Sequence, residues 1–166
     1  MVEAATRVQV ARLLRESAQD LDAMDARAEE LAGLSKELSP AVAPDRRSVL
    51  AVAVNLHGYY TAMETLFERV ARLLDDRLPA GATWHSELLE QMQAEVPGLR
   101  PLVLPQEAVA DVHDLRRFRH FFRNAYTMAF DPPVLLEHAR RVQRVHPILR
   151  RSITALRQQL AAMLAG

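Results

Sequence analysis

The apolar residues of this chain recur at spacings of three, four and seven along most of its length, a pattern that an amphipathic α-helix gathers onto one face. No segment alternates in the way that strands do, and no repeat of fixed period is present. The stripe is unbroken at Val49, Val52, Leu56, Tyr59, Met63, Leu66, Val70 and Leu73. The pattern predicts helices over residues 3–34, 46–78, 84–95, 105–128 and 132–164.

Turn and capping residues separate these segments. Asp45 and Thr83 precede two of the predicted helices as N-cap residues, and Asp131 with Pro132 forms a typical start for the last one. Pro147 lies inside the last helix and should kink it. Short connections favour antiparallel neighbours, so we expect an all-α, antiparallel helical bundle of four long helices plus one short helix, a single domain over residues 1–166.

Composition limits the classes of protein that this chain can belong to. A chain of 166 residues can bury about 70% of its unfolded surface in one core. The absence of cysteine excludes disulfides and thiolate metal sites. No apolar run is long enough for a membrane span, and the N-terminal residues lack the order of a signal peptide. We therefore expect a cytoplasmic protein without a membrane contact, a metal or a cofactor.

The net charge is zero but unevenly distributed. Residues 1–110 hold 11 Lys and Arg against 17 Asp and Glu, whereas residues 111–166 hold 10 against 4. This asymmetry is typical of a chain whose last third meets a polyanion or an acidic partner. The alternative is that the two parts neutralise each other within one bundle.

Residues 115–133 carry the strongest functional signal. Leu115, Phe118, Phe122, Ala125 and Ala129 share one side of a helix, while a polar arc holds Arg116, Arg119, His120, Arg123, Asn124 and Tyr126. Arg119 and Arg123 are one turn apart and repel each other, so the chain either solvates them or offers them to an anion. Arginines mixed with a histidine, an amide and a tyrosine suit phosphate binding better than plain solvation.

Polar residues also interrupt the apolar stripe of the second predicted helix. Asn55, His57, Tyr59, Tyr60 and Glu64 bring polar atoms into a segment that must be largely buried, and buried polar atoms need partners. They either bond within the bundle, or Glu64 or Tyr60 supports the arginines of the polar arc.

The polar arc resembles the signature of HEPN domains, in particular of the HepT-like ribonuclease toxins. That signature is an arginine, a small polar residue, three variable residues, a histidine, and a tyrosine two positions later. Arg119, His120 and Tyr126 match it within RHFFRNAY, whereas Asn124 replaces the histidine. The segments LHGYYTAMETLFERVAR, LPAGATWHSELLEQM, VPGLRP and RRFRHFFRNAY resemble the HepT-like pattern in order and spacing, over about residues 45–150.

The resemblance implies a fold, an activity and partners. HEPN proteins are helical homodimers with both motifs at one cleft, and their nucleases cleave RNA without metal by attack of the 2′-hydroxyl on the adjacent phosphate. Arg119 would stabilise the phosphorane charge, the motif histidine would move protons, and Arg116 and Arg123 would bind RNA. HepT-like toxins pair with a minimal nucleotidyltransferase (MNT-type) antitoxin that attaches AMP to the motif tyrosine, here Tyr126.

Asn124 changes what the motif can do, because an amide neither gains nor loses a proton near neutral pH. The chain is a natural inactive homologue, or a toxin disabled by substitution, or a nuclease in which His120 has taken over. We therefore expect a HepT-like toxin of a toxin–antitoxin pair whose ribonuclease activity is low or absent. The alternative is a non-catalytic HEPN-type dimeric module that binds a nucleotidyltransferase or a nucleotide.

Overall fold

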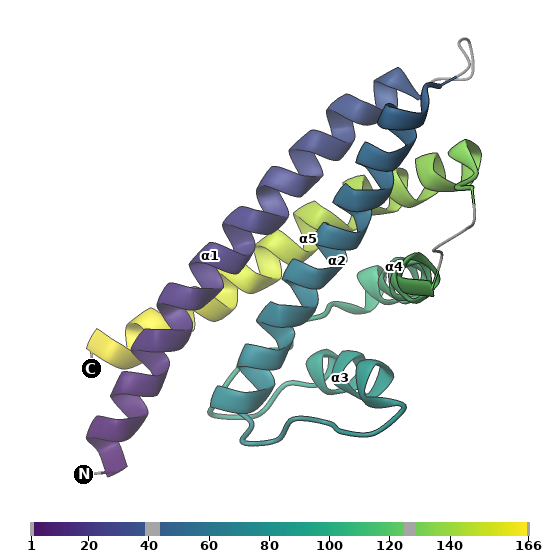
Figure 1. Cartoon of the computed structure of the whole chain (residues 1–166). Coiled ribbons are helices and arrows are strands. Elements are labelled where there is room, and N and C mark those ends of the chain that lie inside the picture. The colour runs from purple at the N-terminus through teal and green to yellow at the C-terminus, as the bar shows by residue number, and fades with distance from the viewer. Residues whose placement is uncertain (1, 39–43, 125–128, 166) are drawn as a thin grey trace.

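The computed structural model describes residues 2–38, 44–124 and 129–165, and this part of the chain is all-α (Figure 1). Its helices are α1 (Val2–Glu37), α2 (Arg46–Leu73), α3 (Trp84–Gln93), α4 (Gln106–Asn124) and α5 (Pro132–Ala165). They are the four long helices and the short one expected from the apolar periodicity.

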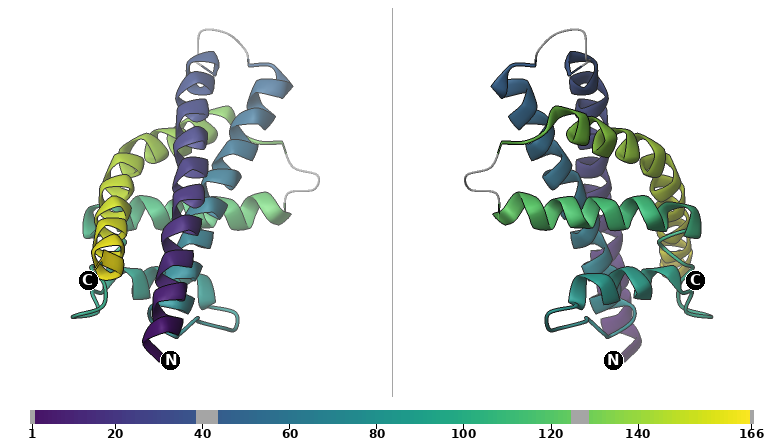
Figure 2. Two further views of the ribbon diagram at one scale, coloured as in Figure 1. Left: turned by 90° about the vertical axis from the view of Figure 1, so that its left-hand side faces the viewer. Right: turned by 90° about the vertical axis from the view of Figure 1, so that its right-hand side faces the viewer.

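The helices are arranged around α2. This helix forms an antiparallel pair with α1 and also packs against α3, α4 and α5 (Figure 1). It buries more of its residues than any other helix in the described part of the chain, as its unbroken apolar stripe predicted. Figure 2 shows that α3 and α4 cross the α1–α2 pair steeply, and a side chain of each meets Glu64 in the C-terminal half of α2. That crossing positions the site described below.

The ends of the helices differ from the predicted bounds where local bonding intervenes. Predicted to reach residue 78, α2 ends at Leu73, because Asp76 takes a left-handed φ of 49° and the Arg77 amide turns back to the Ala71 carbonyl. The predicted N-cap at Asp45 is confirmed, since its side chain accepts from the Ser48 amide. Thr83 makes no such bond, and its hydroxyl donates to Glu87 instead. Pro147 lies within α5, which curves in Figure 2.

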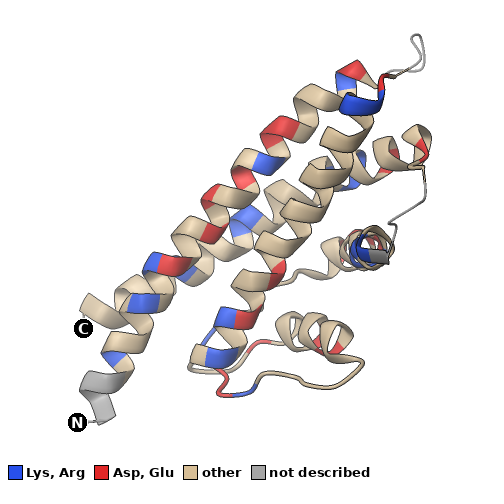
Figure 3. Cartoon of the chain, in the orientation of Figure 1, with Lys and Arg blue, Asp and Glu red and all other residues tan. Residues whose placement is uncertain are grey.

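Acidic and basic residues are interspersed over the long helices rather than sorted into two regions (Figure 3). Arg150 of α5 pairs with Asp25 of α1, and Arg144 of α5 pairs with Asp111 of α4. The first pair joins the basic C-terminal third to the acidic first 110 residues, whereas the second lies within the C-terminal third.

Candidate functional site

Arg119 lies on the face of α4 that meets α2 and α3. Its Nη2 is 3.2 Å from Oε2 of Glu64, a side chain that α2 buries to 5% exposure. Its guanidinium carbon also lies 5.9 Å from the centre of the Tyr60 ring, within cation–π range. Arg119 itself is 14% exposed, so water reaches only its outer edge. Of the two alternatives for the polar residues of α2, Glu64 and Tyr60 therefore follow the second and support the polar arc.

His85, in the first turn of α3, completes this group. Its Nδ1 lies 2.5 Å from Oε1 of Glu64, and its Nε2 lies 3.4 Å from Nη1 of Arg119. An arginine can only donate, so the Nε2 atom must accept and the proton must sit on Nδ1, from where it is donated to Glu64. Of the two neutral tautomers, this contact fits the one with the proton on Nδ1, whose lone pair faces the guanidinium. We call Tyr60, Glu64, His85 and Arg119 the Arg119 cluster.

The Tyr60 hydroxyl shapes the electrostatics of the Arg119 cluster. It is buried without a hydrogen-bond partner among the described residues. Burial, and then the negative charge of Glu64, raise the pKa of Tyr60 far above its usual range. The hydroxyl therefore stays protonated, and the ring serves as an uncharged surface under Arg119.

The pKa of His57 responds to the positive charges around the Arg119 cluster. It lies on α2 one turn before Tyr60, and its ring is 4.6 Å from that of Phe122. Burial, and then the positive charges of Arg119 and Arg123, lower the pKa of His57. Both arginines are thus close enough to act on one imidazole.

The other residues of the polar arc are placed less closely. Arg116 is half-buried and its Nε has no partner within the described region, while Arg123 is exposed in the last turn of α4. His120 is exposed beside Arg119 in sequence. Asn124 is the last residue of α4, but its side chain and the whole of Tyr126 lie outside the described residues. The structure therefore brings Arg119 together with α2 and α3 and leaves the roles predicted for Asn124 and Tyr126 untested.

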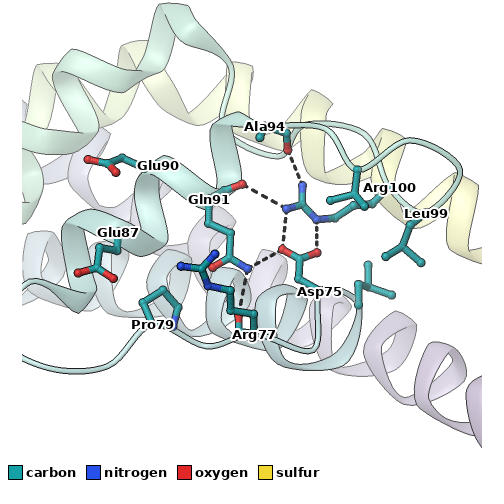
Figure 4. A pocket seen from close by; sticks show the side chains of 11 residues that line it. Asp75, Arg77, Pro79, Glu87, Glu90, Gln91, Ala94, Leu99 and Arg100 are labelled. Carbon is teal, nitrogen blue, oxygen red and sulfur yellow. Dashed lines mark hydrogen bonds and ion pairs between the residues drawn. The ribbon is translucent and has the colours of Figure 1, made fainter.

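A second polar cluster, at the loop that carries α3, is structural. The Arg100 side chain, 1% exposed, forms a two-pronged ion pair with Asp75 at 2.6 and 2.7 Å (Figure 4). It also donates to three main-chain carbonyls, those of Gln91, Ala94 and Pro101. Every guanidinium nitrogen has a partner, so this arginine has no donor atom left without one. It fastens the proline-rich connection between α3 and α4.

His85 is the residue that the sequence reasoning missed. It stands three, four and seven positions before Leu88, Leu89 and Met92, which are the buried residues of α3. A histidine in the register of an apolar face must find a polar partner inside the fold. That register is the signal that could have identified it.

The described part of the chain shows no group of three or more His, Asp or Glu residues arranged to hold a metal ion. None of its helices combines the length and the apolar character that crossing a membrane requires.

Comparison with known families identifies the family of this chain. A family model described as HepT-like protein matches residues 51–160, a range that contains α3, α4 and most of α2 and α5. No similar curated protein and no similar solved structure was found. The match covers every residue of the Arg119 cluster.

Proposed function

Because the chain belongs to the HepT-like family, we propose that it is a HepT-like toxin of the HEPN class whose Arg119 binds an RNA phosphate. The observation that carries the proposal is the placement of this guanidinium. It is held at the protein surface by Glu64, Tyr60 and His85, yet only two of its five N–H donors have acceptors in the described part of the chain. Its Nε is buried, so the donors left for a phosphate are the second N–H groups of Nη1 and Nη2, which can grip it in a fork.

RNA binding tests this role directly. Arg119→Ala should weaken binding to single-stranded RNA and lower the salt slope of log K by about 0.7, the value for one lost phosphate contact. Arg117→Ala is the matched control, since Arg117 lies on the same helix but is 69% exposed and paired with Asp114. Equal affinities and salt slopes for the two variants would show that Arg119 binds no phosphate.

Cleavage should be weak with asparagine at position 124. In this chemistry the 2′-hydroxyl loses a proton and the leaving oxygen gains one, and the Asn124 amide can serve neither step. A positioned acid–base group is worth about 100- to 10,000-fold in rate. Asn124→His should therefore raise cleavage by a factor in that range, in the presence of EDTA and only while Arg119 is intact.

The second candidate function is a non-catalytic dimeric module, and Asn124 is the observation that favours it. Such a module would bind a nucleotidyltransferase or a nucleotide through the same face of α4. It predicts that folded, dimeric Asn124→His protein stays inert on a broad panel of RNAs. That result would replace the ribonuclease proposal with this one.

The proposed partners follow from the family. A homodimer would bring two Arg119 side chains to one cleft, and its mass in solution tests this; a strict monomer at tens of micromolar would contradict it. We further propose that an MNT-type nucleotidyltransferase antitoxin transfers AMP from ATP to Tyr126. Intact mass after incubation with that enzyme and ATP should increase by one AMP in the unmodified chain and not in Tyr126→Phe.

A further inference from the structure

We propose that His85 is the proton-transfer group of the Arg119 cluster and carries the RNA cleavage that remains with asparagine at position 124. This inference rests on the proposed function, because it requires an RNA phosphate at Arg119. It assigns proton transfer to α3, because Asn124 of the polar arc on α4 cannot perform it.

The orientation of the imidazole is the first reason. Glu64 accepts the Nδ1 proton at 2.5 Å and fixes the ring, so the basic Nε2 is directed at Arg119, 3.4 Å away. A carboxylate that holds one nitrogen of a histidine and leaves the other as a base is the arrangement by which hydrolases activate a hydroxyl. The contact of 3.4 Å is long for a hydrogen bond, and a phosphate that takes Nη1 of Arg119 would free this lone pair for the neighbouring 2′-hydroxyl.

Access is the second reason. The His85 side chain is 22% exposed, against 5% for Glu64, so the imidazole is the outer member of the pair and the carboxylate the inner one. Trp84 packs beside the ring at 3.6 Å between centroids and limits its rotation. The Nε2 atom of His85 lies 3.4 Å from Nη1 of Arg119. His120, the histidine that sequence alone suggested as a replacement, is exposed on α4.

The proposed step balances without a metal or a cofactor. As the 2′-oxygen bonds to phosphorus, its proton passes to the Nε2 atom of His85, and the bond from phosphorus to the 5′-oxygen breaks. The 5′-oxygen takes a proton from water, and the imidazolium returns its proton to the hydroxide that is left. Arg119 offsets the added negative charge on the phosphoryl oxygens. The products are a 2′,3′-cyclic phosphate and a 5′-hydroxyl.

The charged groups that face His85 come from two helices, α2 and α4. The imidazole faces Glu64 and, farther away, Glu68 from α2, and Arg119 from α4. A protonated His85 cannot accept from Arg119 or from a 2′-hydroxyl. The rate should therefore fall about tenfold per pH unit on the acid side, as expected for the loss of one base.

The experiment compares single-turnover cleavage of RNA oligonucleotides in EDTA by the unaltered chain, His85→Gln and His113→Gln, with Arg119→Ala as the blank for contaminating nuclease. Glutamine keeps an acceptor for Arg119 but cannot take up a proton. His113 is the matched control, because it is a half-buried histidine of α4 next to Arg116 in the helix and contacts no member of the cluster within the described structure. RNA affinity, melting temperature and mass in solution are measured for each protein.

His85→Gln should lose at least about 100-fold in rate, together with the acid limb of the pH profile, while its RNA affinity is unchanged. His113→Gln should cleave normally. A purely structural role for His85 predicts instead that affinity and melting temperature fall and that the remaining activity keeps its pH profile.

Three results would overturn the inference: no cleavage above the blank by the unaltered chain, cleavage that survives His85→Gln, or cleavage that is lost with His120→Gln instead. Asn124→His, assayed in parallel, separates the two proposals. If that variant binds and cleaves RNA while the unaltered chain does not cleave, the proposed function stands and the role of His85 falls. If neither protein binds RNA, both fail.

Discussion

The buried ion pair between Asp75 and Arg100 allows a stability prediction with a worked magnitude. Arg100→Met removes a guanidinium that is 1% exposed and leaves the Asp75 carboxylate, 8% exposed, without its charge partner. Breaking such a buried pair from one side costs about 3–5 kcal/mol, because an uncompensated charge remains inside. At about 2–4 °C per kcal/mol for a domain of this size, the melting temperature should fall by roughly 6–20 °C.

A double variant tests the reason for that cost. Arg100→Met combined with Asp75→Leu removes both charges, so it should be more stable than Arg100→Met alone although it alters more atoms. It should not recover fully, because the carbonyls of Gln91, Ala94 and Pro101 have lost their donor. None of these three residues is fully buried and the Gln91 carbonyl still accepts from the Ala94 amide, so each lost hydrogen bond should cost only about 1 kcal/mol.

Urea unfolding followed by circular dichroism, supported by calorimetry, measures both variants. A loss below about 1 kcal/mol for Arg100→Met would place this pair among the weak surface pairs. A double variant less stable than the single one would show that the stranded charge is not the source of the cost. Either result would refute the electrostatic account of this cluster.

Two other predictions concern pH and helix caps. Burial is the largest cause of the lowered pKa of four histidines, His57, His113, His138 and His146. Below about pH 6.5 the unfolded chain therefore binds more protons than the folded chain, and the melting temperature should fall as the pH falls. A melting temperature that stays flat or rises would contradict the lowered pKa values. Asp45→Ala removes an observed N-cap bond and should lower the free energy of unfolding in urea by about 1 kcal/mol. Thr83→Ala removes no cap bond and should lower it less. The reverse order would show that the cap geometry does not control stability.

The helices could be predicted from the sequence because their apolar periodicity is long and regular. Their ends were less predictable: α2 stops short at Leu73, where Asp76 takes a left-handed φ and the carboxylate of the neighbouring Asp75 binds Arg100, a residue 25 positions away. Periodicity contains no information about a bond of that kind. The same limit applies to Thr83, whose hydroxyl meets a side chain rather than the backbone.

The candidate site was predicted in part. Arg119 was identified by its neighbours in the polar arc, and Glu64 and Tyr60 were identified as buried polar residues with two possible uses. His85 was not, because its significance depends on α3 folding back against α2 and α4, a tertiary contact that one helical segment does not reveal. The predicted roles of Asn124, His120, Arg116, Arg123 and Tyr126 remain predictions.

Because α3 is attached to the bundle differently from α2 and α4, the two parts of the Arg119 cluster differ in local stability. Glu64 and Arg119 stand on helices of the central bundle, whereas His85 stands on a helix of ten residues that packs mainly on α2 and is fastened by its loop through Arg100 and the Met92 carbonyl. Regions with few such attachments open at a free energy below that of global unfolding. Amide hydrogens of α3 should therefore exchange with solvent sooner than those of α2, and each opening would carry the imidazole away while the guanidinium stays in place. Phosphate binding and proton transfer would then become separable in time, with α3 setting the fraction of molecules in which both groups are present together.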